Sequence, residues 1–556
     1  MTTPEPSILE RDESLPLVRR WWIGMTLIAL LALVVGISNA PRPRPLETHE
    51  VFVAQTSREM LARGDWVLPY FNDKPRLLKP PLAYWLTMGV EKLAPSAPPV
   101  AEWTARLPEA LGGVVVALAT AMIARAVYSP AIGLFAGLLV CGTSGLFRYA
   151  NTARPEMLYA ACCSLMLLGF VRSWRADTAR GGSLGWALLG WASAGLGVLA
   201  KGPHVPGLML LGFAIAMWRE GGVRRIWTVF RPLQGVLVAA AIAAPWPIAV
   251  TMRVENSFGV WFGQMSDEPA RAQRPWRELL SPFYLVGVPQ ILLPWALLLL
   301  PFGLASVFVK RPLALKRGLP LMWVFAVVFV ALSVVTHRRE YYMLPMLCVL
   351  CPLMAAGTAD VLRKGSESVK GRRLVAIVSL LVVACMIGGV AMLGWIDRAM
   401  PDVRLLCLAG AGVGVVLLIW GIALARSGAL GLRLMLPALL AIPVGLAAAG
   451  ASPTLWGSDS YERGVFARQV ASAVKPGETV LLYGEQAGLV TYELGRPAPE
   501  VTTREELAKL VASGTAWVVL PPERMAELPV GVPSKEVARL TARDPGESRV
   551  LVRLGN

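Results

Sequence analysis

The chain of 556 residues is 55% hydrophobic and 16% charged, with a mean hydropathy of +0.55. Soluble domains carry about 25% charged residues, so this composition excludes a disordered chain, a small disulfide-rich protein, a fibrous repeat and an ordinary cytosolic enzyme. The stretch 374–396 is free of charge, and similar stretches recur through the first 450 positions. Since about 20 apolar residues span a bilayer, the sequence predicts a polytopic α-helical membrane protein.

The net charge of +17, from 54 basic and 37 acidic residues, lies mainly between the apolar stretches. Orientation in the membrane and contact with anionic lipid therefore explain it better than nucleic-acid binding does. The seven cysteines lie in or beside apolar stretches without zinc-type spacing, which favours core packing: Cys141, Cys162, Cys163, Cys348, Cys351, Cys385 and Cys407.

Hydropathy predicts thirteen spans, near 21–39, 104–124, 130–147, 157–173, 184–199, 204–218, 233–251, 286–305, 318–336, 341–358, 374–395, 404–425 and 433–451. A secretory signal is the alternative for the first, but its apolar core is long and a proline would follow the cut. Basic residues cluster before the first span and in alternate loops, which predicts a cytoplasmic N-terminus at 1–20. An odd number of spans then places the C-terminus outside.

Three segments are expected outside the membrane domain of 21–452: a loop at 41–103, a loop at 252–285 and a tail at 453–556. In the tail, 479–484 and 516–520 are typical of buried strands, and 503–512 is typical of an amphipathic helix. The alternation predicts a small periplasmic α/β domain.

The first loop is too long for a simple connector. It predicts a helix over 49–63 capped by Thr48 and closed by Gly64. The run 78–85 is predicted to open a second helix with proline in its first turn and with Lys79 extended just before it. Both helices have apolar residues suited to the membrane interface. Glu47, His49 and Glu50 would then lie close to the bilayer surface. Glu47 and Glu50 are candidate catalytic carboxylates, and His49 and Glu47 are candidate ligands of a divalent metal.

Further charged and aromatic residues lie at span ends on the same outer face: Arg154, Glu156, Lys201, Arg338, Arg339, Tyr341 and Tyr342. The positive-inside bias does not account for cations on this face, whereas an anionic ligand at the membrane surface does. Simple pairing, such as Arg154 with Glu156 or Arg339 with Glu340, is the alternative.

These residues carry a resemblance to a known family. Glu47-Thr-His-Glu50, Ser57-Arg-Glu-Met-Leu61 and Lys79-Pro-Pro-Leu-Ala-Tyr-Trp85 resemble the first periplasmic loop of bacterial polyprenyl-phosphate-dependent glycosyltransferases. Arg154-Pro-Glu156 and Tyr341-Tyr-Met-Leu-Pro345 resemble later signatures of the same group. The group is the GT-C superfamily, and the sequence is similar to its lipid A aminoarabinose transferases and its protein mannosyltransferases.

The resemblance implies thirteen transmembrane helices, a periplasmic α/β domain and inverting transfer of a sugar from undecaprenyl phosphate to lipid A or another envelope glycan or protein. It implies catalytic roles for Glu50, Glu47 and Glu156, with His49 where the family usually has aspartate. It implies that the donor phosphate is bound by Lys79, with Arg154, Lys201, Arg338, Arg339, Tyr341 and Tyr342 around it. Leu78 stands where aminoarabinose transferases have glutamate, so the sugar stays open.

A transporter or flippase of lipid-linked sugars is the alternative function. Such proteins place ionisable residues near the bilayer midplane and often contain two similar halves. Here the predicted spans have nearly charge-free centres, charges crowd one face, and no repeat of halves is visible. The pattern therefore favours the transferase.

Overall fold

The computed structural model describes residues 15–40, 44–176, 183–261, 283–299, 313–335, 338–366, 419, 432–451, 458–485, 487–512, 517–529, 531–542 and 545–554. The chain divides into two compact units. The helical unit comprises 1–41, 78–82 and 108–452, and the α/β unit comprises 42–77, 83–107 and 453–556. The first loop and the tail, distant in sequence, thus belong to one unit.

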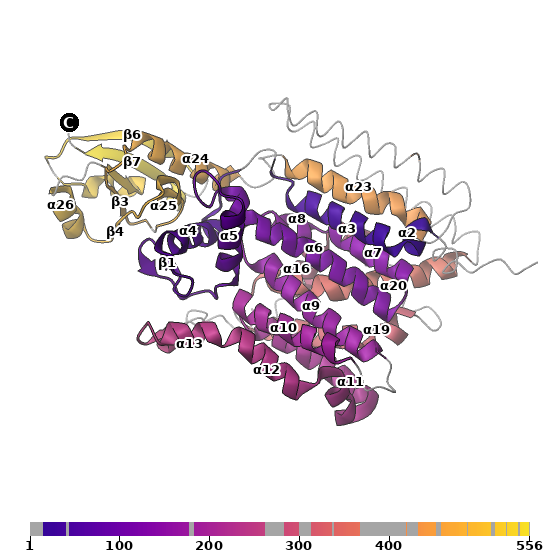
Figure 1. The fold of residues 1–556 in the computed structure, drawn as a ribbon. Coiled ribbons are helices and arrows are strands. Elements are labelled where there is room, and N and C mark those ends of the chain that lie inside the picture. Colours follow the sequence, from indigo (N-terminus) through magenta and orange to yellow (C-terminus); the bar gives the residue numbers. More distant parts are fainter. Residues whose placement is uncertain are drawn as a thin grey trace, which may run out of the picture. The chain divides into compact units, whose positions relative to one another are not determined.

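The described part of the helical unit consists of helices (Figure 1). They are α2 (Pro16–Arg19), α3 (Trp21–Gly36), most of α6 (Glu102–Val127), α7 (Pro130–Cys141), α8 (Ser144–Ala150), α9 (Glu156–Arg175), α10 (Leu184–Ala200), α11 (His204–Phe230), α12 (Pro232–Ala243), α13 (Pro245–Thr251), α16 (Phe283–Leu292), α17 (Trp295–Leu298), α19 (Leu313–Val334), η3 (Glu340–Met346), α20 (Leu347–Ser366) and α23 (Leu432–Gly450).

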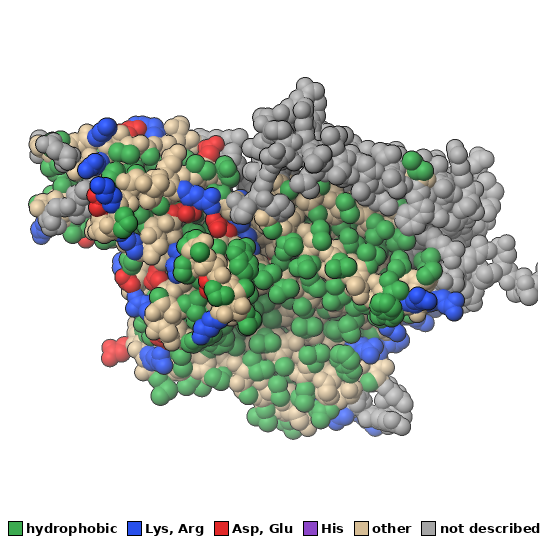
Figure 2. Space-filling view, turned by 45° about the horizontal axis from the view of Figure 1, so that its top comes forward, with side chains coloured by type: hydrophobic (Ala, Val, Ile, Leu, Met, Phe, Trp, Pro, Cys, Tyr) green, Lys and Arg blue, Asp and Glu red, His purple; other side chains and the backbone are tan. Residues whose placement is uncertain are grey.

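Within the described residues, four stretches have the length and composition to cross a membrane: Glu102–Val127, Glu156–Arg175, Ala314–Val334 and Glu340–Val361. Two bent pairs, α7 with α8 and α11 with α12, would bring the number to six. The predicted spans 374–395 and 404–425 lie outside the described residues, so the total of thirteen stays a prediction. On the visible face of this unit, hydrophobic side chains predominate, whereas charged side chains gather on the α/β unit (Figure 2).

The stretch predicted as one span over 130–147 is broken. α7 ends at Cys141, α8 starts at Ser144, and the two axes differ by 54°. The break has a local cause: the Thr143 hydroxyl accepts a hydrogen bond from the Leu146 amide and so starts a new helix. This interruption turns the chain toward the residues around Glu156.

Glycines allow the helices of this unit to approach closely. A Cβ atom on Gly169 of α9 would lie 2.5 Å from the Gly190 nitrogen of α10, and one on Gly212 of α11 would lie 2.6 Å from the Val324 Cα of α19. Small residues at such crossings are typical of membrane helix packing, because they let backbones meet. The crossings hold α9 against α10 and α11 against α19, and the candidate site lies where α9 begins and α10 ends.

The α/β unit contains a five-stranded sheet of order β4-β3-β5-β7-β6. β3 (Val480–Tyr483) runs parallel to β4 (Glu500–Val501) and β5 (Trp517–Leu520), while β7 (Arg549–Leu554) pairs antiparallel with β5 and β6 (Ser534–Leu540). The two strands and the helix predicted from sequence are confirmed as β3, β5 and α26 (Arg504–Ala512). The remaining elements of the tail were not predicted: β4, β6, β7, α24 (Ser458–Ala473), α25 (Leu489–Leu494) and the short 3-10 turns η5 (Pro522–Glu527) and η6 (Pro545–Glu547).

The first loop contributes α4 (Thr48–Arg63), the short pair β1 (Tyr70–Phe71) and β2 (Lys74–Pro75), and α5 (Leu82–Leu93). α4 ends as predicted at Gly64, which adopts a left-handed conformation at φ 67°. Its predicted cap was wrong: Glu47 is the N-cap, in a capping box with Glu50. The second helix starts at Leu82, so both prolines precede it rather than lying in its first turn. Lys79 and Pro80 each precede a proline and are thereby biased away from helical dihedrals, as expected for Lys79.

Polar contacts fasten the first loop to the tail within this unit. The side-chain amide of Asn72 donates to the backbone carbonyl of Ala498 at 2.9 Å and accepts a hydrogen bond from the backbone N–H of Ala498 at 2.8 Å. The Arg58 guanidinium donates to the Tyr492 carbonyl at 2.7 Å and stacks on its ring at 4.2 Å. Sequence separations above 400 residues are thus bridged by a few side chains.

We predict that Asn72→Ala loosens the attachment of the tail to the first loop. Two buried hydrogen bonds are lost and the Ala498 groups are left without partners, a destabilisation of about 1–3 kcal/mol. Hydrogen exchange should accelerate around 496–501. Asp73→Ala is the matched control, because Asp73 shares the positive φ (63° against 55°), whereas its side chain pairs with exposed Arg63 and not with the tail in the described structure. Equal exchange in the two variants would contradict this role of Asn72.

Candidate functional site

The carboxylate of Glu50, in the first turn of α4, is completely buried. It accepts hydrogen bonds from the Glu47 amide and the Arg44 guanidinium, both at 2.8 Å. Arg106 completes the set with a two-point contact, Nε at 2.8 Å and an NH2 nitrogen at 3.0 Å. The capping box therefore places this carboxylate between two arginines, and both its oxygens are engaged.

These contacts make Glu50 strongly acidic. Burial alone raises the pKa of Glu50, but the charges of Arg106 and Arg44 and their hydrogen bonds outweigh burial and lower the pKa to about 2. An ionised carboxylate of this kind is a weak proton acceptor, which suits a residue that holds the start of α4 in place. Glu47, whose side chain is 23% exposed, presents the more accessible carboxylate in the same turn.

The predicted metal ligands Glu47 and His49 lie next to each other along the chain. His49 is exposed and lies against Phe52, with ring centroids 6.3 Å apart. Among the residues that the structure describes, no group of three His, Cys, Asp or Glu side chains gathers in a way that could hold a metal ion. The described residues here thus do not fit a site with three such ligands.

In the helical unit, the side chains at the helix ends centre on Glu156, the first residue of α9, which is 5% exposed. Its Oε1 atom lies 3.2 Å from Lys201 Nζ and 3.4 Å from an Arg154 guanidinium nitrogen. Its Oε2 atom is buried and has no hydrogen-bond partner among the described residues. A buried acceptor without a partner is costly, by about 1–3 kcal/mol, and a bound ligand with a donor group would satisfy it.

Aromatic rings surround these cations. Lys201 Nζ lies 4.2 Å from the Tyr341 ring centroid and 5.3 Å from that of Tyr342, and the Arg154 guanidinium lies 5.2 Å from Tyr341. Burial lowers the pKa of Lys201; Glu156 opposes this effect and the charge of Lys79 adds to it. Lys79 is therefore close enough to act electrostatically on Lys201, although it is exposed and lies more than 100 residues away in sequence.

Of the predicted residues, the helical unit thus brings together Lys79, Arg154, Glu156, Lys201, Tyr341 and Tyr342. Arg338 and Arg339 lie just before η3: Arg338 donates to the Val335 carbonyl at 3.1 Å, and the Arg339 carbonyl accepts from the Tyr284 hydroxyl at 3.2 Å.

Of the two pairs considered as an alternative explanation, Arg154 with Glu156 forms, at 3.4 Å. The carboxylate of Glu340 pairs instead with Arg148 at 2.7 Å and accepts from the Tyr149 hydroxyl at 3.2 Å.

Sequence reasoning missed Glu109. It lies in α6, is 2% exposed, and accepts a hydrogen bond from the Leu158 amide at 2.8 Å. That amide belongs to the first turn of α9, and the amides of a first turn have no hydrogen-bond acceptor within their own helix. Glu109 thus caps from a neighbouring helix the turn that carries Glu156. The available signal was an acid inside an otherwise apolar stretch, the pattern of a functional intramembrane residue.

We predict that Glu109→Ala shifts the first turn of α9, because the Leu158 amide loses its partner at a cost of about 1–3 kcal/mol. Glu109→Gln is the matched control, since its side-chain carbonyl can accept the same bond. The thermal midpoint of the purified protein should fall in the alanine variant and stay near wild type in the glutamine variant. Equal loss in both variants would show that the negative charge, and not the hydrogen bond, is needed.

A second prediction concerns pH. The folded-state pKa of Glu50, about 2, lies below the ordinary value of 4.5, so its stabilising contribution is complete above pH 4.5 and disappears as pH falls toward 2. Glu50→Gln removes the carboxylate that Arg106 and Arg44 share and leaves Arg44 with Glu47 at 3.4 Å, so it should destabilise the α/β unit by about 3–5 kcal/mol at neutral pH.

The gap in stability between wild type and Glu50→Gln should therefore narrow as pH falls from 4.5 to 2. Exposed Glu505 supplies the control, since Glu505→Gln should leave a small gap at every pH. A gap for Glu50→Gln that stays constant with pH would contradict the proposed ion-pair network.

Known proteins resemble this chain in sequence and in fold. Residues 78–248 match the family of dolichyl-phosphate-mannose-protein mannosyltransferases. The chain is 29% identical over 394 residues to an undecaprenyl phosphate-alpha-4-amino-4-deoxy-L-arabinose arabinosyl transferase of Pseudomonas fluorescens, covering 68% of this chain and 66% of the relative. The corresponding protein of Pectobacterium atrosepticum is 30% identical, covering 57% and 56%. The chain thus spans less than two thirds of the length of these relatives.

Solved structures match over nearly the whole chain. ArnT from Cupriavidus metallidurans in the apo state superimposes with a TM-score of 0.71 at 22% identity, covering 96% of this chain and 98% of that one. The same protein bound to undecaprenyl phosphate gives a TM-score of 0.67 at 23% identity over the same shares. The resemblance seen in the sequence is confirmed as a similarity to this group of transferases, and the chain has the fold of ArnT.

Proposed function

We propose that this protein is an inverting membrane glycosyltransferase that moves a sugar, a hexose or a pentose, from undecaprenyl phosphate to an acceptor of the cell envelope. The observation that carries the proposal is the buried Glu156–Lys201 pair with its surplus of cations and one unpartnered oxygen. The relatives named as arabinosyl transferases, and the fold shared with an ArnT structure bound to undecaprenyl phosphate, support the same reading.

The donor phosphate is the natural ligand of this surplus. Lys79, Arg154 and Lys201 carry three positive charges and Glu156 carries one negative charge, which leaves an excess of two. A phosphate brings a matching negative charge and accepts hydrogen bonds from ammonium and guanidinium groups. Tyr341 and Tyr342 exclude water beside Lys201, so its charge acts more strongly on the ligand.

The same cations serve the chemistry. The acceptor oxygen forms a bond with the anomeric carbon on the face opposite the phosphate, the bond from that carbon to the phosphate oxygen breaks, and the configuration inverts. Negative charge grows on the departing phosphate, where Lys79, Arg154 and Lys201 stabilise it. The acceptor proton passes to a carboxylate, for which Glu156 Oε2 and the accessible Glu47 are the candidates, while Glu50 positions the turn that carries Glu47.

The location follows from the same proposal. The protein would lie in the bacterial inner membrane, with 1–20 in the cytoplasm, 21–452 as the transmembrane domain of thirteen spans, and 41–103, 252–285 and the α/β domain of 453–556 in the periplasm. Lipid A is the favoured acceptor because the relatives carry an aminoarabinose name, and another envelope glycan or protein remains within the class. Arg338 and Arg339 are proposed to extend the cationic surface of the donor site.

We predict that Lys79→Ala impairs donor use. Loss of a charge-assisted hydrogen bond to phosphate should raise the activation free energy calculated from kcat/KM for the donor by about 1.5–3 kcal/mol. Lys79→Arg should recover part of this loss. The assay is sugar transfer by purified protein over a range of polyprenyl-phosphate sugar concentrations. Lys92→Ala is the matched control: Lys92 is also a lysine of the first loop, but its ammonium lies 4.7 Å from the Trp66 ring.

Wild-type donor dependence in Lys79→Ala, with active Lys92→Ala alongside, would show that Lys79 does not bind the phosphate. Absence of transfer by the wild type with every polyprenyl-phosphate sugar tested would count against the enzyme class itself.

A further inference from the structure

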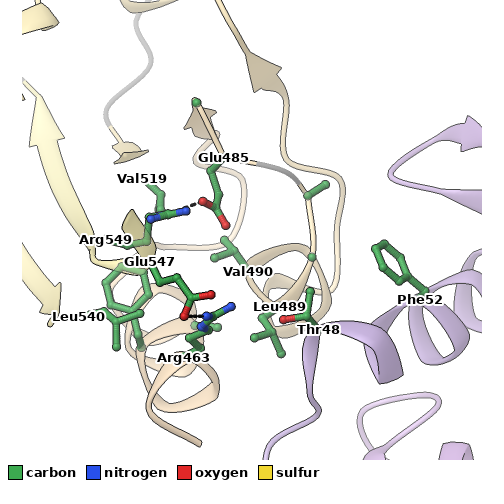
Figure 3. A pocket seen from close by; sticks show the side chains of 15 residues that line it. Thr48, Phe52, Arg463, Glu485, Leu489, Val490, Val519, Leu540, Glu547 and Arg549 are labelled. Carbon is green, nitrogen blue, oxygen red and sulfur yellow. Dashed lines mark hydrogen bonds and ion pairs between the residues drawn. The ribbon is translucent and has the colours of Figure 1, made fainter. Parts of the chain in front are cut away.

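A cavity of about 260 Å³ lies within the α/β unit, apart from the residues assigned to the donor (Figure 3). Its wall is formed by Gly484 and Glu485, where β3 ends, by residues of α24 and β7, and by Thr48 and Phe52 of α4. The carboxyl ends of parallel strands are where open α/β sheets usually bind ligands. The volume lies slightly below the range of drug-sized sites, so the cavity suits a ligand of one or two rings.

Two ion pairs supply the polar wall, as the dashed lines in Figure 3 show: Arg549 with Glu485, and Arg463 with Glu547. All four side chains are partly exposed, between 19% and 40%. Arg549 is further held by the carbonyl oxygens of Gly546 and Ser548, each at 2.7 Å. The wall therefore offers fixed donors and fixed acceptors side by side.

The charge of this wall selects the ligand. Two arginines and two glutamates sum to zero, and each arginine already has its carboxylate. An anion would have to compete with those carboxylates, whereas neighbouring hydroxyl groups can accept from an arginine and donate to the adjacent glutamate at once. A neutral polyhydroxylated ring fits this pattern better than a phosphate does.

The rest of the wall is apolar. Phe52 projects from α4, and Leu489, Val490 and Leu540 line the tail side (Figure 3). A sugar ring has polar edges and apolar C–H faces, so it requires both kinds of surface. Sites that combine an apolar lining with a few fixed polar groups are typical of small-ligand recognition.

We propose that this cavity binds one neutral sugar ring of an envelope glycan. Thr48, in its wall, directly follows Glu47 in the chain, so the bound glycan would be held beside the turn that carries a candidate catalytic carboxylate. The identification of that glycan as the acceptor rests on the proposed function; the binding of the sugar does not.

The test measures binding to the full-length protein, purified in a detergent without a sugar head group. Saturation-transfer NMR with glucose, galactose and N-acetylglucosamine should give signals for at least one sugar, and inorganic phosphate should not compete. Arg549→Gln and Glu547→Gln should weaken binding by about tenfold or more, because each removes a charged hydrogen-bonding group.

Arg539→Gln is the matched control. It breaks an Arg–Glu pair of similar geometry, with Glu536 at 2.6 Å, on β6 and outside the cavity. This variant should bind sugar as the wild type does. Binding that is equally weakened in the control, or unchanged in Arg549→Gln and Glu547→Gln, would overturn the proposal.

Hydrogen exchange of the wild type with and without sugar keeps the proposal testable if the cavity variants do not fold. Protection is expected at 484–490 and 545–549. No sugar signal and no protection, or displacement of the sugar by phosphate, would refute a neutral sugar site. If the wild type binds no sugar but still transfers sugar from the donor, the cavity proposal is wrong and the proposed function stands. If it binds sugar but shows no transfer, the cavity proposal stands and the proposed function is wrong.

Discussion

The neutralisation of one buried carboxylate joins the ends of two helices in the helical unit. A carboxylate as buried as Glu156 is tolerated only with cationic partners, which are Lys201, after α10, and Arg154, in the turn just before α9 itself. Among the described residues, Glu156 Oε2 has no hydrogen-bond partner. The proposed donor phosphate would add an anion to these cations.

The α/β unit solves a similar problem differently. Glu50 has two arginines and a backbone amide, and every one of its contacts is satisfied within the protein. These contacts hold the start of α4 in place, where Glu47 is partly exposed and Thr48 lines the cavity of the α/β unit. Both oxygens of Glu50 thus accept hydrogen bonds within the protein, whereas Glu156 Oε2 accepts none from the described residues. This contrast is the basis for proposing a positioning role for Glu50 and a ligand-binding role for Glu156.

Much of this fold and part of its site were predictable from the sequence. Apolar runs located α3, α6, α9 and α10, and the Thr-Arg-Glu-Glu pattern located α26, because hydrophobic periodicity and capping are local properties. The residues around Glu156 were singled out because cations on the face predicted to be periplasmic, such as Lys201, have no explanation in the orientation rule.

The rest depends on contacts between distant residues. Nothing near Glu109 in the sequence reveals that it caps a turn 49 positions later, and nothing near Asn72 indicates its pairing with Ala498. The start of α5 was misplaced for a different reason: proline is favourable in a first helical turn, but two consecutive prolines also restrict the residues before them. The break between α7 and α8 was missed because a threonine inside an apolar run can either continue a helix or cap a new one.

The central claim is that the cations gathered at Glu156 bind the phosphate of a polyprenyl lipid. The most direct measurement is a structure of the full-length protein in lipid nanodiscs with undecaprenyl phosphate added. The account predicts phosphate density within hydrogen-bonding distance of the ammonium groups of Lys79 and Lys201. Phosphate density at another place in the helical unit, with both lysines free of it, would contradict the account.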